Sequence, residues 1–269
     1  MDRLIDLKRS LLAATRRWIV RSNWLNTRLP WPLWCFLGAA DALAVSWVIA
    51  RRARRPLTFV QIGANDGVMY DPLHAVVRAA GWSGVLVEPV PALYEQLVSN
   101  YAEVPNLEFE NAAIGTSDGT VTLYSVEPRS GDPYWVGLLP SLDRDTIISH
   151  GALVPGIEER IEESQVPSLT LPTLVARHNL STIDLLNVDT EGFDYEILKQ
   201  IDFASTWAPA YIVYECRHFD RTTDRAARRM LRTAGYRLAD IWPDVLAYRV
   251  APEKLAAPAN EWSSSRRSA

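Results

Sequence analysis

The 269-residue chain has only two cysteines, Cys35 and Cys216. This number excludes a fold held by a disulfide framework and a cysteine-rich zinc site, because both need more cysteines. We therefore expect a reducing, cytoplasmic setting. The composition, 48% apolar and 22% charged, is that of an ordinary globular protein with one main domain and an appendage.

The main body of the chain also lacks positive charge. Residues 1–55 hold one lysine and ten arginines against three aspartates, a net charge of +8, which leaves −12 for the rest because the whole chain carries −4. Nucleic acids need a basic protein surface to neutralise their phosphates. We therefore expect no nucleic-acid partner, whereas a small-molecule or carbohydrate partner is compatible with an acidic body.

The appendage, residues 1–55, is both basic and apolar. Residues 3–21 have the spacing of a basic amphipathic helix, which can lie on an anionic membrane or pack on its own domain. Residues 29–50 are long enough to span a bilayer, but Asp41 in their middle makes insertion cost roughly 2.5–3.5 kcal/mol. We expect a folded helical cap, with peripheral membrane contact and a true span as alternatives. The apolar run begins too late for a cleaved signal peptide.

Residues 56–252 form the main domain, in which short apolar strands alternate with helical stretches. This pattern predicts a Rossmann-like α/β fold, with a mainly parallel seven-stranded sheet, helices on both faces and a C-terminal antiparallel hairpin. The expected strands are 58–62, 84–87, 107–113, 120–126, 166–171, 183–188, 210–215, 236–241 and 245–250. The polar residues 253–269 predict a disordered tail.

Residues 127–165 interrupt this rhythm with four prolines and several glycines. A stretch this long between regular elements is usually a lid or a binding loop, and a merely structural insertion is the alternative. Its sequence indicates no particular chemistry, so the identity of any substrate stays open.

A tight turn follows the first expected strand, and its glycines allow a ligand to approach the backbone. A dinucleotide-binding turn needs Gly-x-Gly-x-x-Gly to cradle a pyrophosphate, and Asn65 stands where its second glycine would be. The turn therefore favours a ligand without phosphates, although such turns can also be purely structural. The candidate contacts are Gly63, Asn65, Asp66 and Gly67.

The next two strand ends meet the same edge of the sheet. Glu88 ends the second strand, where its carboxylate can accept hydrogen bonds from both ribose hydroxyls of a nucleoside. Asn111 and Ala112 end the third strand, where backbone amides and a small side chain can hold a flat adenine. The structural alternatives are a solvent-facing glutamate and simple packing of small residues.

Two carboxylates, Asp189 and Glu191, follow an apolar strand that should lie in the centre of the sheet. At the switch point of such a sheet they lie over the cleft rather than on an open face. Glu215 and His218 follow the next strand, so all four side chains can face one pocket. Asp194 is expected in the following helix, where an acidic side chain favours the positive N-terminal end of the dipole.

Together, the segments FVQIGANDG, LVEPVPALYEQL, NAAIG and DLLNVDTEGFDYEILKQID resemble the FkbM family of methyltransferases. The resemblance covers roughly residues 58–250 and implies a class I methyltransferase fold with S-adenosylmethionine over the first two strand ends. It implies methylation of a hydroxyl oxygen on a sugar, glycolipid, polyketide or similar natural product. By position, it places Gly63, Asn65, Gly67 and Glu88 against the cofactor, Ala112 near the adenine, and Asp189 and Glu191 at the reacting end.

Two positions depart from the family pattern. Gln61 stands where members often have an acidic residue, so a direct carboxylate contact at that point is in doubt. Asn187 replaces a lysine that many members carry before the aspartate, which excludes a lysine-based role.

Methyl transfer is an in-line displacement that depends on alignment and on removal of the hydroxyl proton. An imidazole, with a pKa of about 6.5, is a better base for this than a carboxylate with a pKa of about 4. We therefore predict His218 as the general base, with Asp189 or Glu191 orienting the acceptor. No metal is expected, because no aspartate-rich pair or calcium-loop spacing occurs; Mg²⁺ held by Asp189, Glu191 and Glu215 is the alternative.

Two other classes of protein stay open. One is a non-catalytic, membrane-associated binding or scaffold protein with a degenerate methyltransferase fold. Glu88, Asp189 and Glu191 argue against it, and Gln61 argues for it. The other is a nucleoside-binding dehydrogenase, against which Asn65 and the C-terminal hairpin argue.

Overall fold

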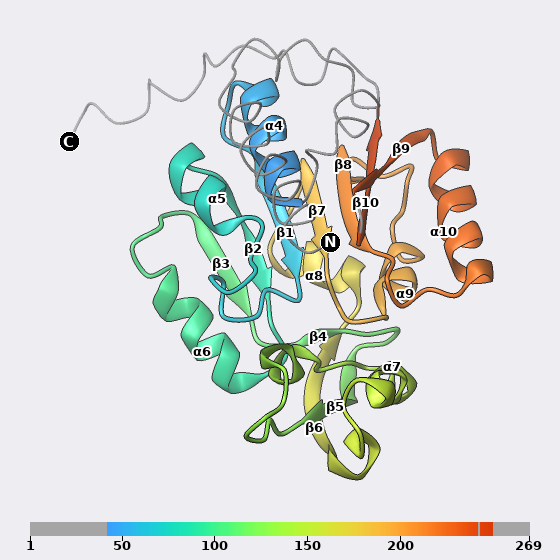
Figure 1. Ribbon diagram of the computed structural model, residues 1–269. Helices are drawn as coiled ribbons and strands as arrows, with labels where there is room; N and C mark the ends of the chain where they lie inside the picture. Colours follow the sequence, from blue (N-terminus) through green and yellow to red (C-terminus); the bar gives the residue numbers. More distant parts are fainter. Residues whose placement is uncertain (1–41, 242, 250–269) are drawn as a thin grey trace, which may run out of the picture.

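A computed structural model describes residues 42–241 and 243–249 of the chain (Figure 1). In these ranges seven strands form a main sheet in the order β3-β2-β1-β7-β8-β10-β9, and three form a smaller sheet in the order β4-β6-β5. Residues 1–41 and 250–269, which hold most of the predicted appendage and the predicted tail, lie outside the described residues.

The main sheet is parallel from β3 to β8 and ends in an antiparallel hairpin, as the sequence predicted. The order reverses between β1 and β7, so the carboxyl ends of these two strands define a switch point, where α/β proteins bind ligands. The strands are β1 Thr58–Ile62, β2 Ser83–Val87, β3 Leu107–Glu110, β7 Leu185–Val188, β8 Tyr211–Glu215, β9 Tyr236–Ile241 and β10 Asp244–Arg249.

Helices cover both faces of this sheet, because side chains alternate along each strand. Phe59 points into a core shared with α4, α5 and α6, while Val60 points into a core shared with α8, α9 and α10. The helices are α4 Ala42–Ala53, α5 His74–Ala80, α6 Pro91–Asn100, α8 Leu171–Arg177, α9 Asp194–Leu198 and α10 Arg221–Thr233.

Helix α4 falls within the range predicted as an appendage, yet it belongs to the core of the main domain. Val45, Val48 and Ile49 are fully buried in the same cluster as Val76 and Val77 of α5. In Figure 1, α4 leads directly into β1. No helix within the described ranges is long and apolar enough to cross a membrane.

The smaller sheet was not expected, and it corrects two predicted strands. The predicted strand 107–113 divides between β3 of the main sheet and β4 (Ala113–Ile114) of the smaller one. Only Asn111 and Ala112 separate the two strands, so the sequence pattern did not mark the point where the chain changes sheets. Strand β6 (Ile161–Leu169) begins five residues before the predicted strand, because residues 161–168 all pair with β5 (Gly119–Val126).

The interrupting segment, residues 127–160, folds beyond the carboxyl ends of the main strands (Figure 1). It packs a small core of its own around Ile147 and Ile157. Its elements are the short 3-10 helices η1 Tyr134–Leu138, η2 His150–Ala152 and η3 Ile157–Arg160, and the helix α7 Arg144–Ser149. We call these residues the insertion.

Candidate active site

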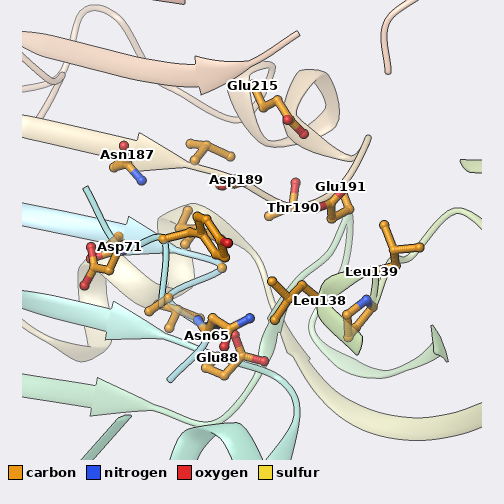
Figure 2. A pocket seen from close by; sticks show the side chains of 18 of the residues that line it. Asn65, Asp71, Glu88, Leu138, Leu139, Asn187, Asp189, Thr190, Glu191 and Glu215 are labelled. Carbon is orange, nitrogen blue, oxygen red and sulfur yellow. Dashed lines mark hydrogen bonds between the residues drawn. The ribbon is translucent and has the colours of Figure 1, made fainter. Parts of the chain in front are cut away.

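A cavity of about 810 Å³ lies at the carboxyl ends of β1, β2, β7 and β8 and is bordered by the insertion (Figure 2). This volume is typical of sites for small molecules. The strand ends supply its polar groups, whereas the insertion supplies a mainly apolar wall, consisting of Trp135, Leu138, Leu139, Pro140, Leu142, His150 and Leu153.

Gly63 brings the turn after β1 into backbone contact with the turn after β7. Its φ is +78°, and a Cβ atom built on it would lie 1.8 Å from the carbonyl oxygen of Asp189. The amides of Gly63 and Ala64 both donate to the carbonyl of Val87 at the end of β2. Gly63 lines the cavity, but the close approach that requires glycine is to the protein backbone.

Glu88 lies at the end of β2, and its side chain is fixed by two backbone amides. Oε2 accepts from the amide of Asn65 at 2.8 Å, and Oε1 accepts from the amide of Val90 at 3.0 Å. The residue is 4% exposed, and this burial raises its pKa to about 7 although the two amides oppose the shift. Figure 2 shows Glu88 beside Asn65 at the cavity, where each carboxylate oxygen keeps a second lone pair for a ligand.

Three of the predicted cofactor contacts support the cavity wall and lie outside its lining as the described residues form it. Asp66 Oδ1 accepts from the amides of Val68 and Met69 and so fixes the turn. Gly67 has no room for a Cβ atom, because Leu97 of α6 lies 2.5 Å from that position. Asn111 Nδ2 donates to the carbonyl of Glu88. Ala112, in contrast, lines the cavity.

Gln61 and Asp71 form a polar pair at the cavity that the sequence reasoning missed. Gln61 Nε2 donates to Asp71 Oδ1 at 3.1 Å, and the hydroxyl of Tyr101 donates to Asp71 Oδ2 at 2.8 Å. Burial raises the pKa of Asp71. Gln61 Oε1 is buried without a hydrogen-bond partner among the described residues. Asp71 follows the first turn by only four residues, but no strand ends there to mark it as a site residue.

The carboxylates of Asp189, Glu191 and Glu215 gather across the cavity from Asn65 and Glu88 (Figure 2). Desolvation by the surrounding protein is the main cause that raises the pKa of Asp189 well above its usual range, and the charge of Glu191 is the second. The part of Asp189 that the protein leaves exposed faces the cavity. Burial, followed by the charge of Asp189, raises the pKa of Glu215 to about 9. The raised values mark a site where negative charge is concentrated and poorly solvated.

His218 lies behind these carboxylates, outside the cavity lining that the described residues form. Its Nε2 atom is 2.9 Å from Oε2 of Glu191 and 3.5 Å from Oε2 of Glu215, and its side chain is 8% exposed. The structure therefore brings together the predicted Asp189, Glu191 and His218. His218 itself does not line the cavity; it contacts Glu191 and Glu215, which do. A second imidazole, His150 of the insertion, lines the cavity with its ring centre 5.4 Å from that of His218.

Asp194 joins the turn after β7 to the end of β8. It is fully buried, and its Oδ2 accepts from both the amide and the hydroxyl of Thr190, at 3.2 and 2.8 Å. Its Oδ1 accepts from the amide of Glu215 at 3.0 Å. Burial raises the pKa of Asp194 to about 6. Asp194 begins α9, as expected. It also links the turn after β7 to the end of β8 and so fixes the positions of their acidic side chains.

The sheet order, the C-terminal hairpin and the ligand-sized cavity at the switch point are those of the class I methyltransferase fold. The family model for the methyltransferase FkbM domain matches residues 61–238. The chain therefore belongs to the FkbM methyltransferase family and is a methyltransferase, as its sequence motifs indicated. No curated protein matches the chain.

The chain is also similar to solved structures at low sequence identity. The FkbM methyltransferase of Methylobacillus flagellatus KT is 11% identical, with a TM-score of 0.44 over 78% of this chain and 55% of that one. The Methanococcus jannaschii fibrillarin pre-rRNA processing protein is 14% identical, with a TM-score of 0.36 over 72% of this chain and 65% of that one. The ribosomal protein L11 methylase of Lactobacillus delbrueckii subsp. bulgaricus is 9% identical, with a TM-score of 0.39 over 77% and 76%.

Proposed function

We propose that the chain transfers a methyl group from S-adenosylmethionine to a hydroxyl oxygen of a sugar, glycolipid or other natural product. The observation that carries this proposal is one cavity with two chemically different ends. One end presents Glu88 and Asn65, which suit a ribose. The other presents Asp189, Glu191 and Glu215, which suit a hydroxylated acceptor and its proton.

The residues at the first end fit the cofactor. Glu88 offers two fixed oxygens to the ribose hydroxyls, and Ala112 offers a small surface to the adenine. Gln61 Oε1, buried without a partner among the described residues, and the carboxylate of Asp71 offer acceptors for the ammonium group of the methionine part. Bound here, S-adenosylmethionine supplies an electrophilic methyl group on its sulfonium.

At the second end, Glu191 would orient the acceptor and Asp189 would take up its proton. The raised pKa of Asp189 makes its carboxylate, once ionised, a stronger base than a carboxylate in water. We place His218 behind Glu191, where the contact of its Nε2 atom holds that carboxylate in position. This modifies the sequence-based role of His218 from direct base to a residue that positions Glu191.

The wall of the cavity supports an acceptor that combines hydroxyl groups with an apolar part. The insertion contributes Leu138, Leu139 and Leu153, and the last of these is 69% exposed at the cavity. The net charge of −12 on residues 56–269 also supports a small-molecule acceptor over a nucleic acid. Peripheral membrane contact through residues 1–55 would suit a glycolipid acceptor.

A transfer assay tests this proposal. The purified chain is incubated with S-adenosyl-[methyl-¹³C]methionine and a panel of hydroxylated sugars, glycolipids and polyketides. Release of S-adenosylhomocysteine and the carbon chemical shift of the new methyl group are then measured. We expect an acceptor-dependent O-methyl product, reduced at least ~100-fold in Asp189→Asn, since general base catalysis contributes on this order.

Glu196→Gln is the matched control for that assay. Glu196 also follows the turn after β7, but its carboxylate pairs with Lys199 at the end of α9, so its loss should leave the rate unchanged. A methyl group found on nitrogen or carbon would contradict the proposed chemistry. Absence of both cofactor binding and transfer in folded protein would favour the scaffold alternative.

A further inference from the structure

Three side chains from separate parts of the chain converge beside the cavity. His150 comes from the insertion, Glu191 from the turn after β7, and His218 from the segment after β8. One ligand atom of each lies within 4.8 Å of the other two, and His218 Nε2 is 2.9 Å from Glu191 Oε2. Two imidazoles and a carboxylate at these separations can close on one cation, whose bonds to such ligands are about 2.0–2.2 Å long.

Two atoms, one in this cluster and one beside it, are buried without the hydrogen bonds that buried polar groups normally make. His150 Nε2 and Glu215 Oε2 both lack a hydrogen-bond partner among the described residues. The side chain of Glu215 is 7% exposed and lies 3.5 Å from His218 Nε2. His150 and Glu215 both line the cavity. A cation bound among them would satisfy the free lone pair of each atom.

The surrounding charge also favours a cation. Asp189, Glu191 and Glu215 offer oxygen atoms within 4.8 Å of one another, so Glu191 belongs to both groups of potential ligands. Arg217 is a positive charge beside these three carboxylates, and its Nε atom lies 3.4 Å from Glu215 Oε1. Imidazole nitrogens suit Zn²⁺ and carboxylates suit Mn²⁺, whereas Mg²⁺ and Ca²⁺ prefer ligand sets made of oxygen alone.

We propose that His150, Glu191 and His218 bind one divalent transition-metal ion of the Zn²⁺ or Mn²⁺ type. Asp189 and Glu215 lie on the cavity side and complete the site. Only the role of the ion rests on the proposed function: it would polarise the acceptor hydroxyl, whose O–H bond breaks as its proton passes to Asp189. The site itself rests on the geometry and differs from the all-carboxylate Mg²⁺ site considered from the sequence.

Calorimetric titration of the chelator-treated full chain with ZnCl₂, MnCl₂ and MgCl₂ tests the site. We expect one equivalent of Zn²⁺ or Mn²⁺ to bind with a micromolar or lower Kd, and Mg²⁺ to bind at least ~100-fold more weakly. His150→Gln and His218→Gln should each weaken binding at least ~10-fold, since each removes one ligand. Co²⁺ added to the wild-type chain should give visible absorption bands that both variants lose.

His178→Gln is the control. His178 also contacts two carboxylates, Glu108 and Glu110, but among the described residues it has no histidine neighbour like the one that His150 and His218 give each other. It should bind the metal as the wild type does. Titration of every protein with S-adenosylmethionine, together with its melting curve, shows that the fold is intact. Should a variant fail to fold, Glu191→Gln replaces it.

The inference is overturned by an absence of saturable Zn²⁺ and Mn²⁺ binding, by Mg²⁺ binding as tight as Zn²⁺, or by metal binding that His150→Gln leaves unchanged. S-adenosylmethionine binding to the metal-free chain separates this failure from failure of the proposed function. A chain that binds S-adenosylmethionine but no metal would refute the metal site alone.

Discussion

The Cα atom of Gly63 and the carbonyl of Asp189 are in such close contact that a Cβ atom on Gly63 would lie 1.8 Å from the Asp189 oxygen. This contact fixes the turn after β1, which carries Asn65, against the turn after β7, which carries Glu191. The two ends of the cavity are therefore held together by the backbone, and the distance between the proposed cofactor and acceptor sites depends on it.

Gly63→Ala should be strongly destabilising. The new methyl group must displace the backbone of Asp189, and a φ of +78° is itself unfavourable for alanine. We expect a loss of about 3 kcal/mol or more in the free energy of unfolding, measured by urea denaturation. Gly81→Ala is the control: its φ is +63° but nothing lies within 4 Å of its Cβ position, so only about 1 kcal/mol should be lost. Equal losses in the two variants would contradict the contact.

The burial of Glu88 predicts a specific pH dependence of stability. Its pKa rises from 4.5 to about 7 on folding, so its contribution to stability is complete below pH 4.5 and is lost as the pH rises through 7. Relative to Glu88→Gln, which does not titrate, the wild type should lose about 2–3 kcal/mol of unfolding free energy between pH 5 and pH 8. Urea denaturation at the two pH values measures this, and a constant difference would show that Glu88 is not desolvated.

The same carboxylate predicts how cofactor affinity changes with pH. A protonated Glu88 offers fewer acceptors to two ribose hydroxyls, so the ionised form should bind the nucleoside more tightly. Below pH 7, the Kd for S-adenosylmethionine should therefore rise by up to about tenfold per pH unit. Fluorescence or calorimetric titration between pH 5 and pH 8 checks this. Glu88→Gln should bind weakly with little pH dependence.

Asp194→Ala should damage both stability and catalysis. The substitution leaves the amides of Thr190 and Glu215, the latter in a buried hydrogen bond, without their acceptor, which costs about 2–4 kcal/mol in unfolding free energy. It also releases the two acidic strand ends, so kcat should fall more than KM changes. Asp220→Ala, which removes the exposed N-cap of α10, is the control and should cost about 1 kcal/mol without affecting kcat. Similar kcat values in the two variants would show that Asp194 does not position the site.

Ser141→Ala tests the link between the insertion and the site. Ser141 is buried, and its hydroxyl donates to the carbonyl of Glu191 at 2.7 Å while accepting from the amide of Asp143. Glu191 has a φ of +49°, which non-glycine residues rarely adopt, so this contact helps to hold a strained turn. We expect KM for the acceptor to rise several-fold and about 1 kcal/mol of stability to be lost. Ser149→Ala, whose hydroxyl bonds within α7, should leave KM unchanged.

Much of the main sheet could be predicted from local sequence patterns. The bounds of β1 and β9 coincide with the predicted strands, because apolar runs bounded by turn residues mark them clearly. The smaller sheet could not be predicted in this way. Ala113 and Ile114 leave β3 to pair with Ser168 and Leu169, more than fifty residues along the chain, and no local pattern indicates such a partner.

The candidate site was predictable where side chains follow strand ends. Glu88, Asp189 and Glu215 line the cavity because the carboxyl ends of parallel strands meet at one edge. His150 gave no such signal, since it lies in an irregular segment and only the packing of the insertion brings it beside His218. Likewise, Asp66 and Asn111 belong to the expected motifs, but their side chains bond to the backbone of the turns.

The most direct measurement of the central claim is calorimetric titration of the purified chain with S-adenosylmethionine and, separately, with NADH. We predict saturable binding of S-adenosylmethionine alone, weakened at least ~10-fold by Glu88→Ala, since the loss of two charge-assisted hydrogen bonds exceeds 1.4 kcal/mol. Glu110→Ala should bind as the wild type does, because this carboxylate ends the next strand but contacts Arg177 and His178. Binding of NADH instead, or S-adenosylmethionine binding that Glu88→Ala leaves unchanged, would contradict the account.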